Sequence, residues 1–320
     1  MAAAARLLLL LVVLGWVRPG ACTDPPGGGW LAGTVPEEPR CTVERADASL
    51  TYSLFLQRFA FSRPVILGGV TDNSVSAARG QRVPGGTHLP VPRERRQHPG
   101  SPRSIPQAFR ALCTRDKLLA AFGPFPVRLS TANTYSYRKV DVPFQEYVEH
   151  LLKPQDPARL GSDTLYFFGD NNFTEWGPLF QHYVPPPFRI PGTSPAYSFG
   201  IAGSGSGVPF HWHGPGFSEV IFGRKRWFLY PPEQTPHFHP NESTLAWLQH
   251  TYPTLPPAQL PLECTLRPGE VRPALQGTPG FPARAVRPHW CPLQVLYFPD
   301  RWWHATLNLD TSVFISTFLG

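Results

Sequence analysis

Apolar residues recur along this chain at two different spacings, and the change from one to the other comes near residue 196. Before it, residues 50–61, 109–122 and 144–152 carry apolar side chains three and four positions apart, the period of a helix with one buried face. Gly123 follows the second segment, where a glycine commonly ends a helix. The pattern predicts three helices on the outside of the fold.

After residue 196 the apolar pattern shortens to brief segments separated by glycine-rich and proline-rich turns. A composition with 40 prolines and 13% aromatic residues suits strands and turns better than a helical bundle. Many short strands with such turns are typical of a jelly roll, so the predicted fold class is mainly β with flanking α-helices. The predicted strands are residues 197–201, 208–213, 218–222, 226–230, 295–298, 304–309 and 312–318, with one short helix at 243–250.

The first 21 residues have the layout of a secretory signal peptide. Arg6 precedes an apolar run over residues 7–14, and Gly15, Pro19 and Ala21 then supply a helix break and small residues. The run is too short to span a bilayer, and an uncleaved anchor is the alternative. We expect a chain of the secretory pathway, in the lumen of the endoplasmic reticulum, with no transmembrane span. The C-terminus is not a Lys-Asp-Glu-Leu retention signal, so residence there would need a partner or another signal.

Glycosylation triplets and scattered cysteines fit that route. The triplets that begin at Asn172 and Asn241 match the acceptor pattern for N-glycosylation and predict two glycosylation sites. One disulfide is compatible with the cysteines beyond the signal peptide, and the pairing stays open. These cysteines lack the close spacing of a zinc knuckle or redox pair, and they are Cys41, Cys113, Cys264 and Cys291.

The formal charge of +7 is concentrated in two segments. Residues 75–107 contain six arginines and one glutamate, and residues 271–294 contain three arginines and no acidic residue. Together they exceed the charge of the whole chain, so the remainder is not basic and a nucleic-acid partner is not expected. Both segments are rich in proline and lack an apolar period, which predicts disordered inserts.

These inserts define the predicted domain organisation. Residues 22–74 form an N-terminal segment, 75–107 the first insert, and 108–320 a β-rich core that the second insert, 271–294, interrupts. Both inserts begin with Val and end with Gln, whose codons fit intron boundaries. Translated introns are therefore one hypothesis, which a transcript population that always carries both segments would exclude, and a basic docking arm is the other.

A His-x-His pair and a later histidine are the main candidates for chemistry. Residues i and i+2 of a strand point to the same face, so His211 and His213 can converge, and a distant strand can add His304. Three imidazoles predict a site for a divalent metal, with satisfied core histidines or an empty pocket as alternatives. A second pair, His237 and His239, is flanked by prolines, which favours an incidental loop.

Three blocks of sequence resemble the JmjC domain of the cupin superfamily, especially its small hydroxylase-type members. The resemblance covers nearly all of the chain outside the signal peptide and the inserts, and it implies a double-stranded β-helix. The blocks are Val-Pro-Phe-His-Trp-His at 208–213, Gly-Arg-Lys-Arg-Trp-Phe-Leu-Tyr-Pro-Pro at 223–232, and Leu-Tyr-Phe-Pro at 296–299 with Trp-Trp-His-Ala-Thr-Leu-Asn-Leu at 302–309.

The resemblance also implies a set of site residues. In that family Fe(II) is held by His-x-Asp/Glu and a later His, and a strand-borne Lys or Arg pairs with the far carboxylate of 2-oxoglutarate. Carried over, His211 and His304 are metal ligands and Lys225 binds the co-substrate, with a solvated strand lysine as the alternative. His213 stands where the carboxylate is expected, and Glu219 is an alternative carboxylate ligand.

Two further positions depart from the family pattern. Val208 lies where a Thr often binds the co-substrate, and Phe217 lies where an Asn is common. Apolar side chains there would leave a bound carboxylate with fewer hydrogen bonds. The departures imply weakened oxygenase chemistry, so whether the chain is an enzyme stays open.

We therefore expect a lumenal regulator or adaptor in a signalling pathway, non-catalytic or weakly catalytic, that acts through protein partners. The alternative is an Fe(II)- and 2-oxoglutarate-dependent protein hydroxylase of the secretory pathway. Histone demethylation is not expected, because a signal peptide directs the chain away from chromatin. Partner, substrate and a homo-oligomeric state stay open.

Overall fold

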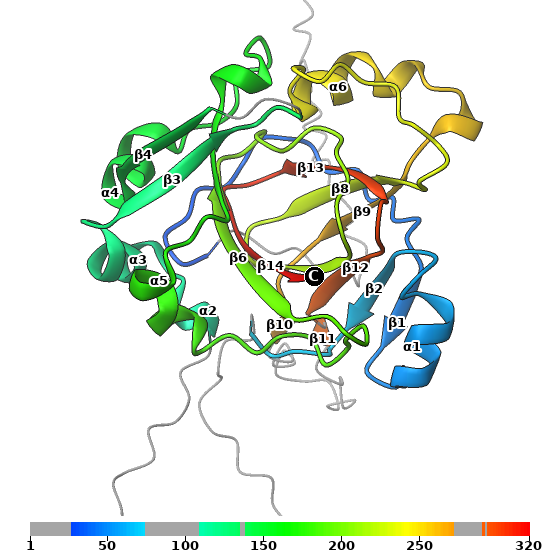
Figure 1. Ribbon diagram of the computed structural model, residues 1–320. Coiled ribbons are helices and arrows are strands. Elements are labelled where there is room, and N and C mark those ends of the chain that lie inside the picture. Colours follow the sequence, from blue (N-terminus) through cyan, green and yellow to red (C-terminus); the bar gives the residue numbers. More distant parts are fainter. Residues whose placement is uncertain (1–26, 74–108, 135–137, 272–289, 292) are drawn as a thin grey trace, which may run out of the picture.

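The described part of the protein is built on two facing sheets that curl into a barrel (Figure 1), in agreement with the mainly β prediction. This computed structural model describes residues 27–73, 109–134, 138–271, 290–291 and 293–320. The predicted signal peptide and most of both predicted inserts lie outside these residues. No helix of the described part is long and apolar enough to cross a membrane.

The larger sheet forms one wall of the barrel, in the strand order β1-β2-β12-β7-β14-β6-β5-β3-β4. The opposite wall has the order β13-β8-β9. The large sheet comprises β1 (Arg45–Asp47), β2 (Val65–Gly68), β12 (Gln294–Phe298), β7 (Gly216–Phe222), β14 (Ser312–Leu319), β6 (Pro195–Ala202), β5 (Leu165–Phe168), β3 (Pro126–Thr131) and β4 (Lys139–Pro143). The small sheet comprises β13 (Trp303–Asn308), β8 (Lys225–Tyr230) and β9 (Leu262–Leu266).

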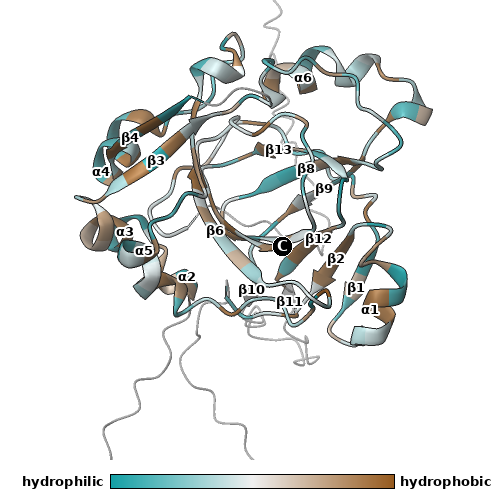
Figure 2. Ribbon diagram, in the orientation of Figure 1, coloured by the Kyte–Doolittle hydropathy of each residue, from teal (hydrophilic) through white to brown (hydrophobic). Residues whose placement is uncertain are grey.

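Most helices pack outside the large sheet, while the helix at Thr244–His250 contacts β13 of the small sheet. Figure 2 shows apolar residues along β2 and β6. The helical prediction at 50–61 is confirmed by α1 (Tyr52–Arg58), and the prediction at 144–152 by α4 (Phe144–Glu146) with a π-helix (Tyr147–Leu151). Residues 109–122 form two helices, α2 (Phe109–Leu112) and α3 (Arg115–Phe122). The others are α5 (Phe173–Phe180), α6 (Thr244–His250) and short 3-10 helices at Gly161–Asp163, Tyr252–Thr254 and Pro257–Gln259.

The predicted strand at residues 208–213 is wrong. Its described backbone makes one bridge, between His211 and His304. The Thr306 N–H also donates to the Val208 carbonyl at 3.0 Å. Residues 208–211 therefore lie opposite the shorter stretch 304–306, and this mismatch in length is that of a β-bulge. Pro209 lacks the N–H that a regular ladder would need. The segment therefore follows the edge of β13 without forming a strand.

The second insert is shorter in the fold than the sequence predicted. The strands β10 (Glu270–Val271) and β11 (Trp290–Cys291) pair antiparallel, and β12 begins at Gln294. The last residue of β10, all of β11 and the first residue of β12 lie within the predicted insert 271–294, yet they belong to the described structure. At the first insert, the Arg110 N–H donates to the Asn73 carbonyl at 2.8 Å, so the chain on either side of residues 74–108 is joined there.

A disulfide fastens the N-terminal segment to the small sheet. It links Cys41 to Cys264 in β9, across 223 residues of sequence. Cys113 is a buried free thiol. The pairing that the sequence left open is therefore settled for these two cysteines.

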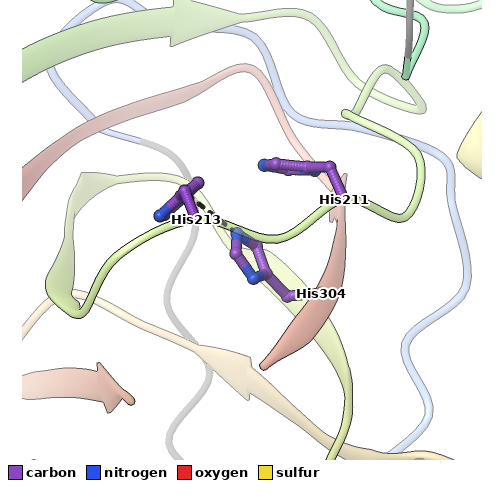
Figure 3. A group of neighbouring side chains, drawn as sticks. All are labelled: His211, His213 and His304. Carbon is purple, nitrogen blue, oxygen red and sulfur yellow. Dashed lines mark hydrogen bonds between the residues drawn. The ribbon is translucent and has the colours of Figure 1, made fainter. Parts of the chain in front are cut away.

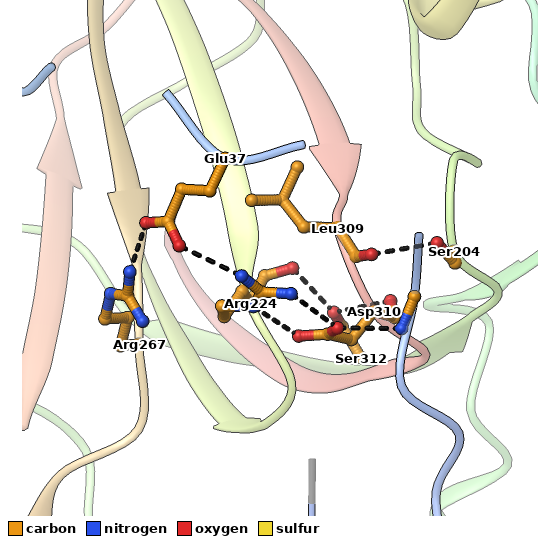
Figure 4. Close-up of polar contacts among 8 residues, drawn as sticks. Glu37, Ser204, Arg224, Arg267, Leu309, Asp310 and Ser312 are labelled. Atoms are coloured by element: carbon orange, nitrogen blue, oxygen red, sulfur yellow. Dashed lines mark hydrogen bonds and ion pairs between the residues drawn. The ribbon is translucent and has the colours of Figure 1, made fainter. Parts of the chain in front are cut away.

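An ion-pair cluster provides a second fastening (Figure 4). Arg224 forms a two-pronged pair with Asp310, with nitrogen–oxygen distances of 2.6 and 2.8 Å, and also bonds Glu37 at 3.0 Å. Glu37 in turn pairs with Arg267, and the Gly33 N–H donates to Asp310 at 2.8 Å. The cluster joins the N-terminal segment to the start of β8 and to the turn after β13, next to the strand residues that line the interior.

Candidate metal centre and cavity

Backbone pairing brings the three predicted histidines together. His211 and His304 exchange both backbone hydrogen bonds, at 3.1 and 2.8 Å, and the Arg301 N–H donates to the His213 carbonyl at 3.0 Å. Figure 3 shows the three rings facing a common point. Trp212, between the two histidines, points to solvent and is 52% exposed.

Backbone carbonyls fix the tautomer of each imidazole. The Nδ1 atoms of His211, His213 and His304 each lie 2.8 Å from a carbonyl oxygen, of Pro209, Gly214 and Trp302 respectively. A carbonyl can only accept, so each Nδ1 carries the proton and each Nε2 presents a lone pair. This second contact is the usual way in which a protein orients a metal-binding histidine.

The Nε2 atoms then face one another without a proton between them. Those of His213 and His304 are 3.1 Å apart, and the ligand atoms of all three residues lie within 4.8 Å of one another. Facing lone pairs repel unless a cation lies between them. The donor set therefore fits a divalent metal, and it is the only such cluster among the described residues.

Burial keeps the three rings neutral. It lowers the pKa of His211 to about 4, and it lowers the pKa of His213 as well. Burial also lowers the pKa of His304 well below its ordinary value, with the two neighbouring imidazoles adding to the effect. Neutral imidazole is the form that binds metals.

A cavity of about 250 Å³ extends from the histidines into the barrel. No Asp or Glu is among the described residues that line it. Its polar wall includes Lys225, Tyr166 and Thr306, and its apolar wall includes Val208 and Phe314. A loaded metal site would therefore face a cavity without a protein counter-charge.

Lys225 is buried at the wall of this cavity, so the alternative of a solvated lysine is wrong. Its Nζ donates to the Tyr166 hydroxyl at 2.7 Å and to the Asn308 Oδ1 at 3.2 Å, and it lies 3.7 Å from the centre of the Phe314 ring. Burial lowers the pKa of Lys225 well below its ordinary value. A bound anion would favour the charged ammonium, so the lysine can respond to a carboxylate.

Phe217 and Glu219 do not belong to the site. Phe217 faces outward, with its ring centre 5.0 Å from that of Tyr297, and Ser218 lines the cavity instead. Glu219 is fully buried on the same outward side, where Asn73 donates to it at 3.1 Å. The alternative of Glu219 as a metal ligand is therefore wrong, and Phe217 does not form an apolar cavity wall.

The sequence reasoning missed Tyr166 and Asn308. Tyr166 lies in β5, a strand that the apolar pattern did not reveal. Asn308 could have been predicted from the sequence. Residues 306 and 308 lie on the same face of β13 as His304, so they point into the barrel with it. Val208 lines the cavity as expected.

The other candidate residues lie outside the cavity. The exposed Asn172 caps α5 by accepting from the Thr174 N–H at 3.0 Å, and Asn241 accepts from the Ser162 N–H at 2.9 Å. His237 and His239 lie in a loop before α6 and form no metal-type cluster with described residues.

A barrel of this kind with a histidine cluster at its mouth is consistent with the cupin-like domain family. The sequence pattern of that family matches residues 57–318, and the chain belongs to it. In the same family, JmjC domain-containing protein 8 of Homo sapiens is 59% identical over 323 residues, covering 100% of both chains. The protein of that name from Rattus norvegicus is 58% identical over 327 residues, again over 100% of both.

Among solved structures, the chain is similar to ycfD of Escherichia coli. That chain is 16% identical, with a TM-score of 0.43, and the match covers 85% of this chain and 53% of the other. The structure of YcfD with cobalt and 2-oxoglutarate is described as that of a ribosomal oxygenase, and it is 17% identical with a TM-score of 0.38.

Proposed function

We propose that this chain is a metal-binding JmjC-fold protein of the secretory pathway with little or no oxygenase activity, which acts as a regulator or adaptor through protein partners. The observation that carries the proposal is the donor set of His211, His213 and His304, in which an imidazole replaces the carboxylate. In this proposal the three histidines still bind a divalent metal, but the metal does not support efficient dioxygen chemistry.

The charge of the site supports weak catalysis. Fe(II) bound by two imidazoles and a carboxylate supplies dioxygen chemistry in the family. A third neutral ligand leaves the full double charge of the ion in a cavity whose described lining contains no acidic residue. That charge opposes the loss of electrons on which dioxygen chemistry depends, and His213 offers no carboxylate to orient a water.

The location in the secretory pathway has two supports. The apolar run at residues 7–14 follows the pattern of a signal peptide. The Cys41–Cys264 disulfide is of a kind that persists in oxidising compartments and is rare in the cytosol. Cell fractionation with protease protection tests this part, and a protease-sensitive cytosolic pool would contradict it.

The test of weak catalysis is a 2-oxoglutarate decarboxylation assay on iron-loaded protein. We expect no turnover above background for the wild type and measurable turnover for His213→Asp, which restores the carboxylate. His237→Asp is the matched control, because it makes the same change in a loop outside the cavity. Turnover by the wild type equal to that of His213→Asp would contradict the proposal.

A specific observation favours the second candidate, an Fe(II)- and 2-oxoglutarate-dependent protein hydroxylase. Lys225, with Tyr166 and Asn308, forms a buried polar group that faces the cavity and suits a carboxylate. The same decarboxylation assay separates the two candidates, since only the hydroxylase predicts turnover by the unaltered chain.

A further inference from the structure

The donor atoms available to the metal are all imidazole nitrogens. The Nε2 atoms of His211, His213 and His304 converge, while their Nδ1 atoms are held by backbone carbonyls. Oxygen ligands suit the harder ions, whereas imidazole suits Zn, Cu, Ni and Fe. Among the described residues the cluster thus offers three nitrogen donors and no carboxylate.

The acidic residues near this cluster make contacts with other residues. Glu219 faces away from the cavity and accepts from Asn73. Asp300 is exposed and lies 3.5 Å from the guanidinium of Arg301. Neither residue lines the cavity, and no described carboxylate belongs to the cluster of metal-type ligands.

We propose that the resident metal of this site is Zn²⁺, held by three histidines with a fourth position open to the cavity. The inference rests on the metal site of the proposed function and specifies its ion. Three histidines and one exchangeable ligand form a donor set that proteins use for zinc. Zn²⁺ also lies above Fe²⁺ in the general affinity order for nitrogen sites, and no carboxylate offsets that preference here.

The cavity is consistent with an exchangeable fourth ligand. It begins at the histidines, it is large enough for several waters or a small anion, and none of the described residues that line it is acidic. Zinc has no redox chemistry, so a zinc site would also account for a JmjC fold without oxygenase activity.

Metal competition tests the inference directly. The full chain, freed of metal, is equilibrated without oxygen against equal concentrations of Zn²⁺ and Fe²⁺, and bound metal is measured by mass spectrometry. We expect one zinc per chain in the wild type. His213→Asp should lower the preference for zinc over iron by about tenfold or more, and His237→Asp should leave it unchanged.

A cobalt spectrum provides a readout that needs no variant. Co²⁺ in a four-coordinate site absorbs strongly in the visible range, and six-coordinate Co²⁺ absorbs weakly. We expect the strong spectrum for the wild-type chain and a weaker one for His213→Asp. A weak six-coordinate spectrum from the wild type would overturn the zinc assignment, even if the variant fails to fold.

The outcomes separate this inference from the proposed function. Preferential retention of iron by the wild type overturns the zinc assignment, and the proposed function still stands if that iron protein is inactive. If the wild type and His213→Asp prefer zinc over iron equally, the third imidazole is not the cause of that preference. This outcome also overturns that part of the inference. Failure to bind either metal overturns both.

Discussion

At the residue scale, the site depends on which face of a strand each side chain occupies. Ser218 lines the cavity, while its neighbours Phe217 and Glu219 face the outer layer. The resemblance to the family placed Phe217 in the site, but the alternation of β7 assigns that place to the next residue. The sequence identified the histidines through the His-x-His spacing of His211 and His213 and through the block that contains His304, although residues 208–213 form no strand.

Glu219 gives a prediction about pH. Burial raises its pKa to about 8, against an ordinary value near 4.5, so the folded protein holds a proton that the unfolded chain releases between these values. The stability that this carboxyl contributes is full below about pH 4.5 and is lost as the pH rises through about 8. By pH 7 the loss is on the order of 3 kcal/mol.

Glu219→Gln should remove this dependence. Urea unfolding from pH 5 to 8 should show the variant gaining stability relative to the wild type as the pH rises. Glu146→Gln, which changes an exposed residue of α4, is the control and should follow the wild-type curve. A constant difference between Glu219→Gln and the wild type across this range would refute the prediction.

Lys225 gives a prediction about anion binding. If the cavity accepts a small dicarboxylate such as succinate, Lys225→Met should weaken that binding by at least about tenfold, because a buried carboxylate loses its charged partner. Calorimetry on the metal-loaded chain measures the effect. Lys139→Met is the control, since Lys139 also lines the cavity but is exposed and paired with Asp170. Equal weakening by both variants would exclude a specific role for Lys225.

At the element scale, the regular strands were easier to predict than the irregular one. β6, β7, β8, β12, β13 and β14 agree with the predicted segments, because their apolar runs and turn residues are clear. The stretch 208–213 carries the same apolar signal, but Pro209 and the bulge opposite β13 prevent a ladder. β1 to β5 and β9 to β11 were missed because they are short, and most of them lie among helices.

The ion-pair cluster at the start of β8 gives a prediction about stability. Asp310 is fully buried, and Arg224→Ala would leave its carboxylate without its main partner. We expect a loss of about 3 kcal/mol in the free energy of unfolding. Arg128→Ala removes a similar two-pronged pair with Asp141 that is about half exposed, and this control should cause little change. Equal losses for the two variants would contradict this account.

At the scale of the whole molecule, long-range fastenings hold the N-terminal segment on the barrel. The disulfide between Cys41 and Cys264 spans most of the chain, and Glu37 reaches both Arg224 and Arg267. The sequence could not predict these contacts, because a pairing across 223 residues leaves no local pattern. The fold class could be predicted, because it follows from many local patterns that agree.

Reduction of the disulfide tests the first fastening. Because it closes a long loop, its loss should lower the free energy of unfolding by roughly 3 kcal/mol. Thermal unfolding with and without reductant measures this change. The double variant Cys41→Ser, Cys264→Ser should start at the lower stability and be insensitive to reductant; a double variant that still responds would show that another thiol is responsible.

The proposed function depends above all on the binding of one divalent metal per chain by His211, His213 and His304. Equilibrium dialysis of the metal-free full chain against Zn²⁺, with His304→Ala beside it and His237→Ala as the control, measures this most directly. We predict one bound ion for the wild type and for His237→Ala, and loss of that ion in a folded His304→Ala. Equal binding by all three proteins, or no binding by the wild type, would contradict the account.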